Sequence, residues 1–264
     1  MKHFIRTGIQ RLAARNEVFV GGLAARADVS AAILLLRPVS IQTPLIRIGG
    51  QGDGGYLLPD DLDGIDACFS PGVDDVATFE TQLARDYHIP CFLADASVDR
   101  SPSEHPLITF EKKLIGSDPS ENFIGLEDWV AQRQAGTGDL VLQIDVEGAE
   151  FDIFAHLSDA TLMRFRTIVI ELHHLHNLFS RGALPLIASF FRKLTKSHHV
   201  VHLHPNNCAP AVTRNGISVP PLLEVTLHRK DRCILTHRQL SFPHSLDRPN
   251  VNEMLDIELP SCWR

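Results

Sequence analysis

From Ile65 onward, short apolar segments alternate with longer amphipathic segments along the chain. The apolar segments have the length and composition of buried strands, and the amphipathic ones repeat their apolar residues at helical spacing. This alternation predicts an α/β fold, with a mainly parallel sheet and helices on both faces. The predicted strands cover residues 65–70, 89–97, 107–115, 139–145, 165–173, 198–205 and 221–229. The predicted helices cover residues 74–87, 126–134, 150–157 and 184–197.

The first 45 residues follow a different pattern. We predict that residues 1–45 form a helical extension ahead of one domain that spans residues 46–264. The segment 1–17 is basic before its first acid, and its apolar residues fall near helical spacing. It is expected to pack on the domain, and peripheral contact with a membrane surface is the alternative. No apolar run in the sequence approaches the ~20 residues that are needed to span a bilayer.

The overall charge and the cysteines exclude several classes of protein. Asp and Glu number 32 against 25 Lys and Arg, which gives a formal net charge of −7. A nucleic acid is therefore not expected as a partner, because its binding proteins usually present a basic face. The five cysteines form no C-x-x-C pair, which disfavours a disulfide scaffold or a zinc ribbon and favours the reducing cytoplasm. The sequence does not indicate an oligomeric state.

Polar residues that follow the predicted strands are the first candidates for a functional site. In open α/β sheets, ligands bind at the carboxyl ends of the strands, at the point where the strand order reverses. The residues at these ends are Ser70, Pro71 and Gly72 after the first strand, Asp95 after the second, Asp145 and Glu147 after the fourth, Glu171 and His173 after the fifth, and His204 after the sixth.

The turn of residues 70–72 has features of a cofactor-binding turn. Gly72 lets a ligand approach the backbone, and the helix that follows offers free N–H groups. Asp95 lies 95 − 72 = 23 residues further on, near the ~20-residue offset at which an acid binds ribose in nucleotide-binding folds. Asp74 and Asp75 would repel a phosphate, so the pattern favours a positively charged ligand such as S-adenosylmethionine. The alternative is that Asp74 only caps the helix.

A glycine-rich loop precedes the first strand of the predicted alternation. Five glycines fall between Gly49 and Gly55 in the segment RIGGQGDGGYLL. A simple turn does not need so many, and we predict a loop that folds over a ligand and contacts it through Asp53, Gly54 and Tyr56. A flexible surface loop is the alternative.

Three carboxylates crowd around Gly148 in the segment LVLQIDVEGAEFDIF. Gly148 is expected to form a sharp turn from strand to helix, which would direct Asp145 and Glu147 into the cleft. Glu150 is expected to serve the first turn of the helix, where a negative charge is favourable.

Histidines at strand ends are candidates for proton transfer. A side chain with a pKa near neutrality is suited to remove a proton from a hydroxyl group, and His173 and His204 are favoured because each ends a strand. Asp145, Glu147 and a histidine could instead bind a divalent cation. No H-E-x-x-H or other tight ligand spacing is present in the sequence, so no metal is predicted.

Six segments in sequence order resemble the FkbM-type methyltransferase family. They are GDGGYLLPDDL, CFSPGVDDVATFE, FLADASVD, LQIDVEGAEFDIF, IVIELHHL and VVHLHPNN, within roughly residues 45–235. The hallmark of the family is a D-x-E-G-x-E stretch after the fourth strand, which residues 145–150 match. The resemblance implies a class I, Rossmann-like fold with a mostly parallel seven-stranded sheet, an antiparallel last strand, and S-adenosylmethionine as the cofactor.

The resemblance also implies roles for individual residues. Ser70, Gly72 and Asp95 would hold the cofactor, and Asp145 and Glu147 would lie at the methyl-transfer cleft. The chain departs from the family after the first strand, where FSPGVDD, which includes Pro71, stands in place of D-x-G-A-N-x-G. We expect Asp53 in the glycine-rich loop to compensate by contacting the cofactor.

Family members mostly methylate hydroxyl groups, often on sugars. The expected function is S-adenosylmethionine-dependent O-methylation of a sugar, glycan or glycolipid-type acceptor. Asp145 would orient the methionine end of the cofactor or the acceptor hydroxyl, Glu147 would bind the acceptor, and His173 or His204 would be the base. The alternatives are a metal-assisted sugar O-methyltransferase and a non-catalytic binding protein that retains the fold. The sequence does not identify the acceptor.

Overall fold

The computed structural model describes residues 21–117 and 120–264. The predicted N-terminal amphipathic helix, and with it the predicted membrane contact, falls in residues 1–20 and lies outside the described residues. Within the described part of the chain, no helix has the length and apolar character that crossing a membrane requires.

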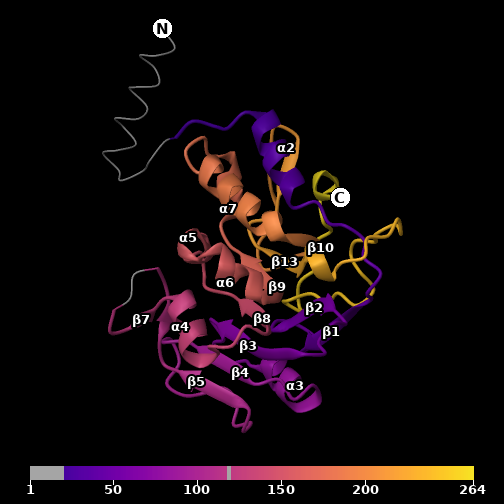
Figure 1. Cartoon of the computed structure of the whole chain (residues 1–264). Coiled ribbons are helices and arrows are strands. Elements are labelled where there is room, and N and C mark those ends of the chain that lie inside the picture. Colours follow the sequence, from indigo (N-terminus) through magenta and orange to yellow (C-terminus); the bar gives the residue numbers. More distant parts are fainter. Residues whose placement is uncertain (1–20, 118–119) are drawn as a thin grey trace.

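A seven-stranded sheet forms the centre of the structure (Figure 1). Its strands are β3 (Ile65–Pro71), β4 (Cys91–Ala94), β5 (Ile108–Glu111), β8 (Asp139–Ile144), β9 (Phe165–Leu172), β10 (His198–Pro205) and β13 (Leu223–Arg229). They are ordered β10-β13-β9-β8-β3-β4-β5. Strand β13 is antiparallel to both of its neighbours, and the other adjacent pairs are parallel. The predicted Rossmann-like fold, with a mostly parallel sheet and an antiparallel last strand, is confirmed.

Two layers cover the sheet, one on each face. One layer holds α3 (Thr78–Asp86) and the hairpin of β1 (Leu45–Gly49) and β2 (Gly55–Pro59). The other holds α2 (Arg26–Leu35), α4 (Leu126–Arg133), α5 (Glu150–His156), α6 (Asp159–Arg164) and α7 (Leu184–Ser197). The short elements are β6 (Leu114–Ile115), β7 (Phe123–Ile124), β11 (Val212–Arg214), β12 (Ile217–Val219), η1 (Leu175–Phe179), η2 (Lys230–Arg232) and η3 (Ser261–Trp263).

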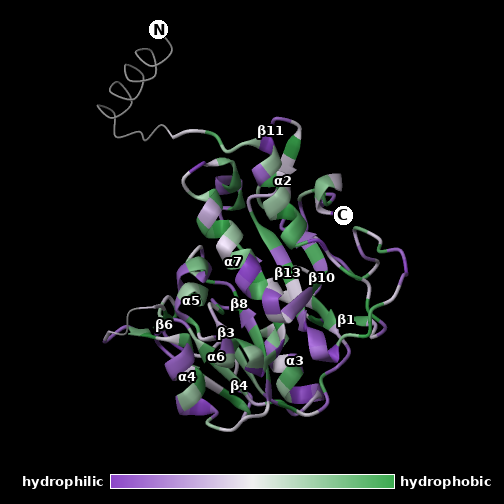
Figure 2. Ribbon diagram, turned by 45° about the horizontal axis from the view of Figure 1, so that its top comes forward, coloured by the Kyte–Doolittle hydropathy of each residue, from purple (hydrophilic) through white to green (hydrophobic). Residues whose placement is uncertain are grey.

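The alternation of side chains along the strands creates these two cores. Leu140, Leu142 and Ile144 of β8 pack with the helical layer, whereas Val141 packs with α3 and the hairpin. Figure 2 shows both hydrophilic and hydrophobic stretches along α3 and α4, as expected of helices with one buried face. Because both faces of β8 are buried, its side chains are apolar on both faces.

The described part of the predicted N-terminal extension lies against the domain. Helix α2 packs beside α7 at the top of Figure 1, and Val29 and Ile33 are buried in the same core as the sheet. The backbone N–H of Ala24 also donates to the carbonyl of Phe179, at 2.8 Å. This segment adds a helix to the layer that contains α7.

Most predicted elements differ from the observed ones by one to three residues at an end, and two differ more. The helix predicted over residues 74–87 begins only at Thr78, because Asp74, with a φ of 46°, and Ala77, with a φ of −125° and a ψ of 45°, both lie outside the helical range. Val76, which lies inside the predicted range, is 51% exposed. The strand predicted over residues 107–115 is divided into β5 and β6. Between them, the backbone N–H of Lys113 donates to the carbonyl of Glu111 at 2.8 Å.

Strands β3 and β8 are neighbours at the point where the strand order reverses. After β3 the chain adds β4 and β5 on one side, and it then returns to place β8 on the other. At their carboxyl ends the two strands nearly touch: a Cβ on Gly72, whose φ is 79°, would lie 1.6 Å from the carbonyl oxygen of Asp145. This is the position at which an open α/β sheet binds its ligand.

Candidate active site

A cavity of about 460 Å³ opens at the carboxyl ends of β3, β4 and β8. That volume is in the range of sites for small organic ligands. Its lining includes the predicted cofactor residues Asp53, Gly54, Tyr56, Gly72, Asp95 and Asp145, together with Asp74, Glu80, Gln143 and Glu147. Six of the described lining residues are acidic, and no Lys or Arg is among them. The cavity therefore suits a ligand with a positive charge.

A second cavity of about 400 Å³ shares part of this lining. Asp53, Asp145 and Glu147 line both cavities. The second cavity adds Glu171, His173 and His174, the polar residues Asn206, Cys208 and Asn250, and three apolar or Pro residues. Two ligands bound side by side would thus meet at Asp53, Asp145 and Glu147.

The glycine-rich loop between β1 and β2 is held in place by hydrogen bonds. Arg47 donates through Nε to the carbonyl of Gly50, at 2.8 Å, and through Nη2 to that of Gly52, at 2.9 Å. The Thr78 hydroxyl at the start of α3 donates to the carbonyl of Gly54 and accepts from the N–H of Gly50, both at 3.1 Å. The loop is thus fixed against α3, with the exposed Asp53 at its tip, and its contact with a ligand stays a prediction.

Asp95 organises the turn that follows β3. Its carboxylate accepts the N–H of Asp74 at 3.0 Å and the N–H of Ser97 at 2.7 Å. Burial alone would raise the pKa of Asp95, but these hydrogen bonds hold it below the ordinary value. An ionised carboxylate has about four acceptor positions, so Asp95 keeps acceptor capacity for ligand hydroxyls.

Ser70 lies behind the first cavity, in a chain of buried polar side chains. It is fully buried and hydrogen-bonded to Glu80 of α3 and to Gln143 of β8, and Gln143 donates in turn to the hydroxyl of Tyr56 at 3.4 Å. Burial raises the pKa of Glu80 above its ordinary value, and the hydrogen bond that Ser70 donates to its carboxyl group opposes this. Neither Ser70 nor Pro71 is among the described residues that line the two cavities.

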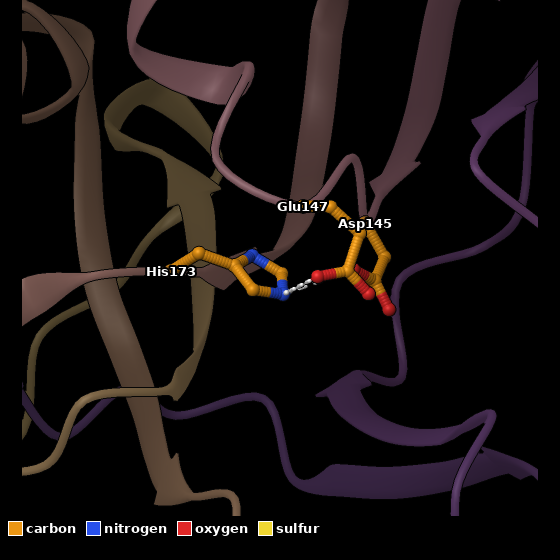
Figure 3. Close-up of side chains that lie close together, drawn as sticks. All are labelled: Asp145, Glu147 and His173. Carbon is orange, nitrogen blue, oxygen red and sulfur yellow. Dashed lines mark ion pairs between the residues drawn. The ribbon is translucent and has the colours of Figure 1, made fainter.

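Asp145, Glu147 and His173 converge where the two cavities meet (Figure 3). The carboxylates come from the turn after β8 and the imidazole from the end of β9, and their side chains point toward one another. His173 Nε2 lies 3.6 Å from Asp145 Oδ1 and 3.4 Å from Glu147 Oε2. The three side chains range from buried to open, with exposed fractions of 4% for His173, 27% for Asp145 and 87% for Glu147.

The turn that carries the two carboxylates is fixed by Glu150. Glu147 and Gly148 both have positive φ, 54° and 104°, which reverses the chain between β8 and α5. The fully buried Glu150 accepts the N–H of Gly148 at 2.8 Å and the N–H of His173 at 2.7 Å. Glu150 therefore ties the acidic turn to the end of β9, a larger structural role than the predicted one at a helix N-terminus.

Burial and crowding of charges shift the pKa values in this group. Burial raises the pKa of Asp145 to about 7; nearby His173 opposes this, and the neighbouring acids add to it. Burial would lower the pKa of His173, but Glu150 and Asp145 raise it to about 9. Strongly perturbed groups in a cleft are typical of functional sites.

His204, the second predicted base, lies in a different environment. Its side chain is 3% exposed and contacts Glu224 Oε2 through Nδ1 and Asp256 Oδ1 through Nε2, both at 3.3 Å. It is not among the described residues that line either cavity.

Asn250 lines the second cavity from the C-terminal segment, and the sequence did not predict it. No pattern in that Pro-rich segment relates Asn250 to the strand ends.

Two solved structures are similar to this chain at low identity. One is a precorrin-6y C5,15-methyltransferase from Geobacter metallireducens, with 12% identity, a TM-score of 0.35, and coverage of 80% of this chain and 93% of that one. The other is a mutant of a 16S rRNA (adenine(1408)-N(1))-methyltransferase from Catenulisporales acidiphilia, with 10% identity, a TM-score of 0.29, and coverage of 71% and 98%. A search of curated proteins found no match.

A family model provides the remaining comparison. It is described as the methyltransferase FkbM domain, and it matches residues 126–197. This segment runs from α4 to the end of α7 and includes β8, the acidic turn and β9. The resemblance predicted from the sequence is therefore confirmed over residues 126–197, the part of the chain that is similar to the FkbM methyltransferase domain.

Proposed function

We propose that this chain transfers a methyl group from S-adenosylmethionine to a hydroxyl group of a neutral, hydroxyl-rich acceptor such as a sugar, glycan or glycolipid. The observation that carries the proposal is the pair of cavities that meet at Asp53, Asp145 and Glu147, at the carboxyl ends of the central strands. A transferase for two substrates needs adjacent sites that share a wall.

The first cavity fits the cofactor. When bound, S-adenosylmethionine supplies an electrophilic methyl group on a positively charged sulfur. The acidic lining favours such a cation, and the buried Oδ1 of Asp145 has no hydrogen-bond partner among the described residues. Asp95 would accept from ligand hydroxyls and Asp53 would close the loop over them, with Gly54, Tyr56 and Gly72 as the surrounding wall. Ser70 and Pro71 would act from behind this wall.

The second cavity would receive the acceptor. Carboxylate and amide groups of Glu171, Asn206 and Asn250 can each bind hydroxyl groups. No Lys or Arg is among its described lining residues, and the nearby carboxylates would repel a phosphate. These features support a neutral polyhydroxylated acceptor over a phosphorylated or nucleotide-linked one.

The acceptor hydroxyl must lose its proton during the transfer, and we place this step at Asp145, Glu147 and His173. Asp145 and Glu147 would orient the hydroxyl. Direct acceptance of the proton by neutral His173 is the simplest form of the step, because Nε2 faces both carboxylates. With a pKa of about 9, this neutral form increases as the pH rises, so the rate should rise with pH toward 9. His204 has no part in the proposal, because Glu224 and Asp256 occupy both of its ring nitrogens.

Calorimetric titration with S-adenosylmethionine tests the cofactor site. The wild-type chain is expected to bind it, and Asp53→Ala is expected to bind about tenfold more weakly, since a contact to a charged group contributes roughly 1–3 kcal/mol. Glu104→Ala is the control, because Glu104 is also an exposed acid but lies outside both cavities. Equal affinity of the Asp53 variant and the wild type would reject the role of Asp53. Absence of binding by the wild type would favour a non-catalytic protein that retains the fold.

A further inference from the structure

The side chains of Asp145, Glu147 and His173 have the spacing of metal ligands. One ligand atom from each lies within 4.8 Å of the others, and Nε2 of His173 is 3.6 and 3.4 Å from the two carboxylate oxygens. Two atoms at about 2.1 Å from a common ion lie about 3.0–3.4 Å apart when they subtend 90–109°. Small rotations of the more exposed Glu147 would bring all three atoms to coordination distance.

Two buried polar groups in this cluster lack hydrogen bonds. The imidazole of His173 is 4% exposed, and its buried Nδ1, which faces Glu150, has no hydrogen-bond partner among the described residues. Asp145 Oδ1, which faces Nε2, is likewise buried and without a hydrogen-bond partner among the described residues. Because buried polar groups are nearly always satisfied in native proteins, the orphaned Oδ1 of Asp145 points to a ligand on the side of the ring where Nε2 of His173 lies.

The surroundings of His173 also match those of a coordinating histidine. A histidine that binds a metal through one ring nitrogen usually directs the other toward a carboxylate or a carbonyl group. Nδ1 of His173 lies 3.6 Å from Oε1 of Glu150, whose own position is fixed by the N–H groups of Gly148 and His173. Glu150 would thus orient the imidazole with Nε2 toward the two carboxylates.

We propose that Asp145, Glu147 and His173 bind one divalent cation of the Mn²⁺ or Zn²⁺ type. Two carboxylates and one imidazole suit these ions better than Ca²⁺, which prefers an all-oxygen site. Asp53 adds a further acidic side chain to the cavity walls, and no Lys or Arg is among the described lining residues. Three protein ligands also leave positions open for other oxygen atoms.

The role of the cation rests on the proposed function. The acceptor hydroxyl would bind at an open position, where the positive charge lowers its pKa. Its O–H bond would break with the electron pair remaining on oxygen, and the proton would pass to water. His173 would then be a ligand rather than the base, which changes its assignment but keeps proton removal at the same three residues.

Metal binding to the full chain tests the inference without any turnover. We expect Mn²⁺ to bind with one-to-one stoichiometry in electron paramagnetic resonance, or Zn²⁺ to do so in calorimetry, in the absence of S-adenosylmethionine. Glu147→Gln should weaken this binding about 10- to 100-fold. Glu147 is the decisive position because its side chain is 87% exposed, so the variant should fold even if Asp145→Asn or His173→Gln does not. His156→Gln is the matched control, since His156 also pairs with a carboxylate, Asp152, but at the surface.

Absence of one-to-one binding of both ions, or equal affinity of Glu147→Gln and the wild type, would overturn the inference. Parallel titrations with S-adenosylmethionine separate this result from the proposed function. A chain that binds the cofactor but no cation would leave the proposed function standing with His173 as the base. A chain that binds the cation but not the cofactor would retain the metal site and reject the methyltransferase proposal.

Discussion

Gly72 lies where the carboxyl ends of β3 and β8 come close together. A Cβ there would lie 1.6 Å from the carbonyl oxygen of Asp145, and its φ of 79° is unfavourable for other residues. Gly72→Ala must therefore separate the two strand ends and shift Asp145. We expect the variant to lose about 2–4 kcal/mol of unfolding free energy in urea denaturation.

Gly136→Ala is the control for that substitution. Gly136 is exposed, has no positive φ, and a Cβ there would meet no described atom within 4 Å. Its unfolding free energy should change by no more than about 0.5 kcal/mol. Similar stabilities of the two variants would show that the approach at Gly72 is not under steric constraint.

The sequence allows prediction of those site residues that directly follow an apolar strand. Asp95, Asp145 and His173 were selected because each follows an apolar strand, and the structure places all three along the cavities. The same reasoning selected Ser70 and His204, which lie behind other side chains. Successive residues of a strand point to opposite faces of the sheet. A strand end that is predicted one residue too early or too late therefore places the candidate side chain on the wrong face.

At the scale of elements, a buried histidine links α7, β10 and β9. His198 begins β10; Phe165 begins β9, and its carbonyl lies 2.7 Å from Nε2 of His198, while Ser197 Oγ lies 2.9 Å from Nδ1. A carbonyl only accepts, so Nε2 carries the proton and Nδ1 accepts from the hydroxyl. The neutral ring is thus fully hydrogen-bonded inside the core.

This arrangement predicts a loss of stability in acid. Burial, with a contribution from Arg229, lowers the pKa of His198 from 6.5 to about 4. The unfolded chain therefore binds a proton at a higher pH than the folded chain does. The stabilisation is fully present above pH 6.5, and up to about 3 kcal/mol of it is lost as the pH falls toward 4. In denaturant titrations, His198→Gln should lose less stability than the wild type between pH 7 and 4.5.

Exposed His237 provides the control for that experiment. His237→Gln should retain the full acid-dependent loss, because its side chain is at the surface in either state. If His198→Gln and His237→Gln show the same pH dependence, the proton linkage does not belong to His198.

The bounds of elements were predictable where local signals agree. The predicted bounds of α7 and β10 coincide with the observed ones, since α7 has one apolar face and a Pro in its first turn. The start of α3 was not predictable, because the N–H of Asp74 is bound by Asp95, which is 21 residues away in the chain. Local periodicity contains no information about such a distant partner.

At the scale of the whole molecule, the C-terminal segment joins the sheet edge to the second cavity. His202 Nε2 lies 2.8 Å from Asp247, Asn250 donates to Glu224 at 2.6 Å, and Asn207 accepts from the N–H of Val251 at 2.8 Å. The composition of this segment shows only that it is Pro-rich and irregular. Its path depends on side-chain contacts with β10 and β13, so the sequence did not predict that it lines the second cavity.

A positive charge on His204 would attract the acidic C-terminal segment to the sheet, and substitution of His204 tests this. Burial alone would lower the pKa of His204, but Glu224 of β13 with Asp247 and Asp256 of the C-terminal segment raise it from 6.5 to about 9. A raised pKa means that the folded chain holds the proton more tightly than the unfolded chain. The stabilisation is therefore fully present below pH 6.5 and is lost as the pH rises through 9, by up to about 3 kcal/mol.

We expect His204→Gln to flatten this alkaline loss of stability in denaturant titrations between pH 6.5 and 9. At pH 6.5, the same variant should also be cleaved faster than the wild type within residues 244–256 in limited proteolysis, because a neutral side chain holds the acidic segment less tightly. His88→Asn is the control, since His88 is exposed and its φ of 56° is tolerated by Asn. An unchanged pH profile and cleavage rate in His204→Gln would show that hydrogen bonds of other residues hold the segment. The charge of His204 would then contribute nothing to the position of the segment beside the second cavity.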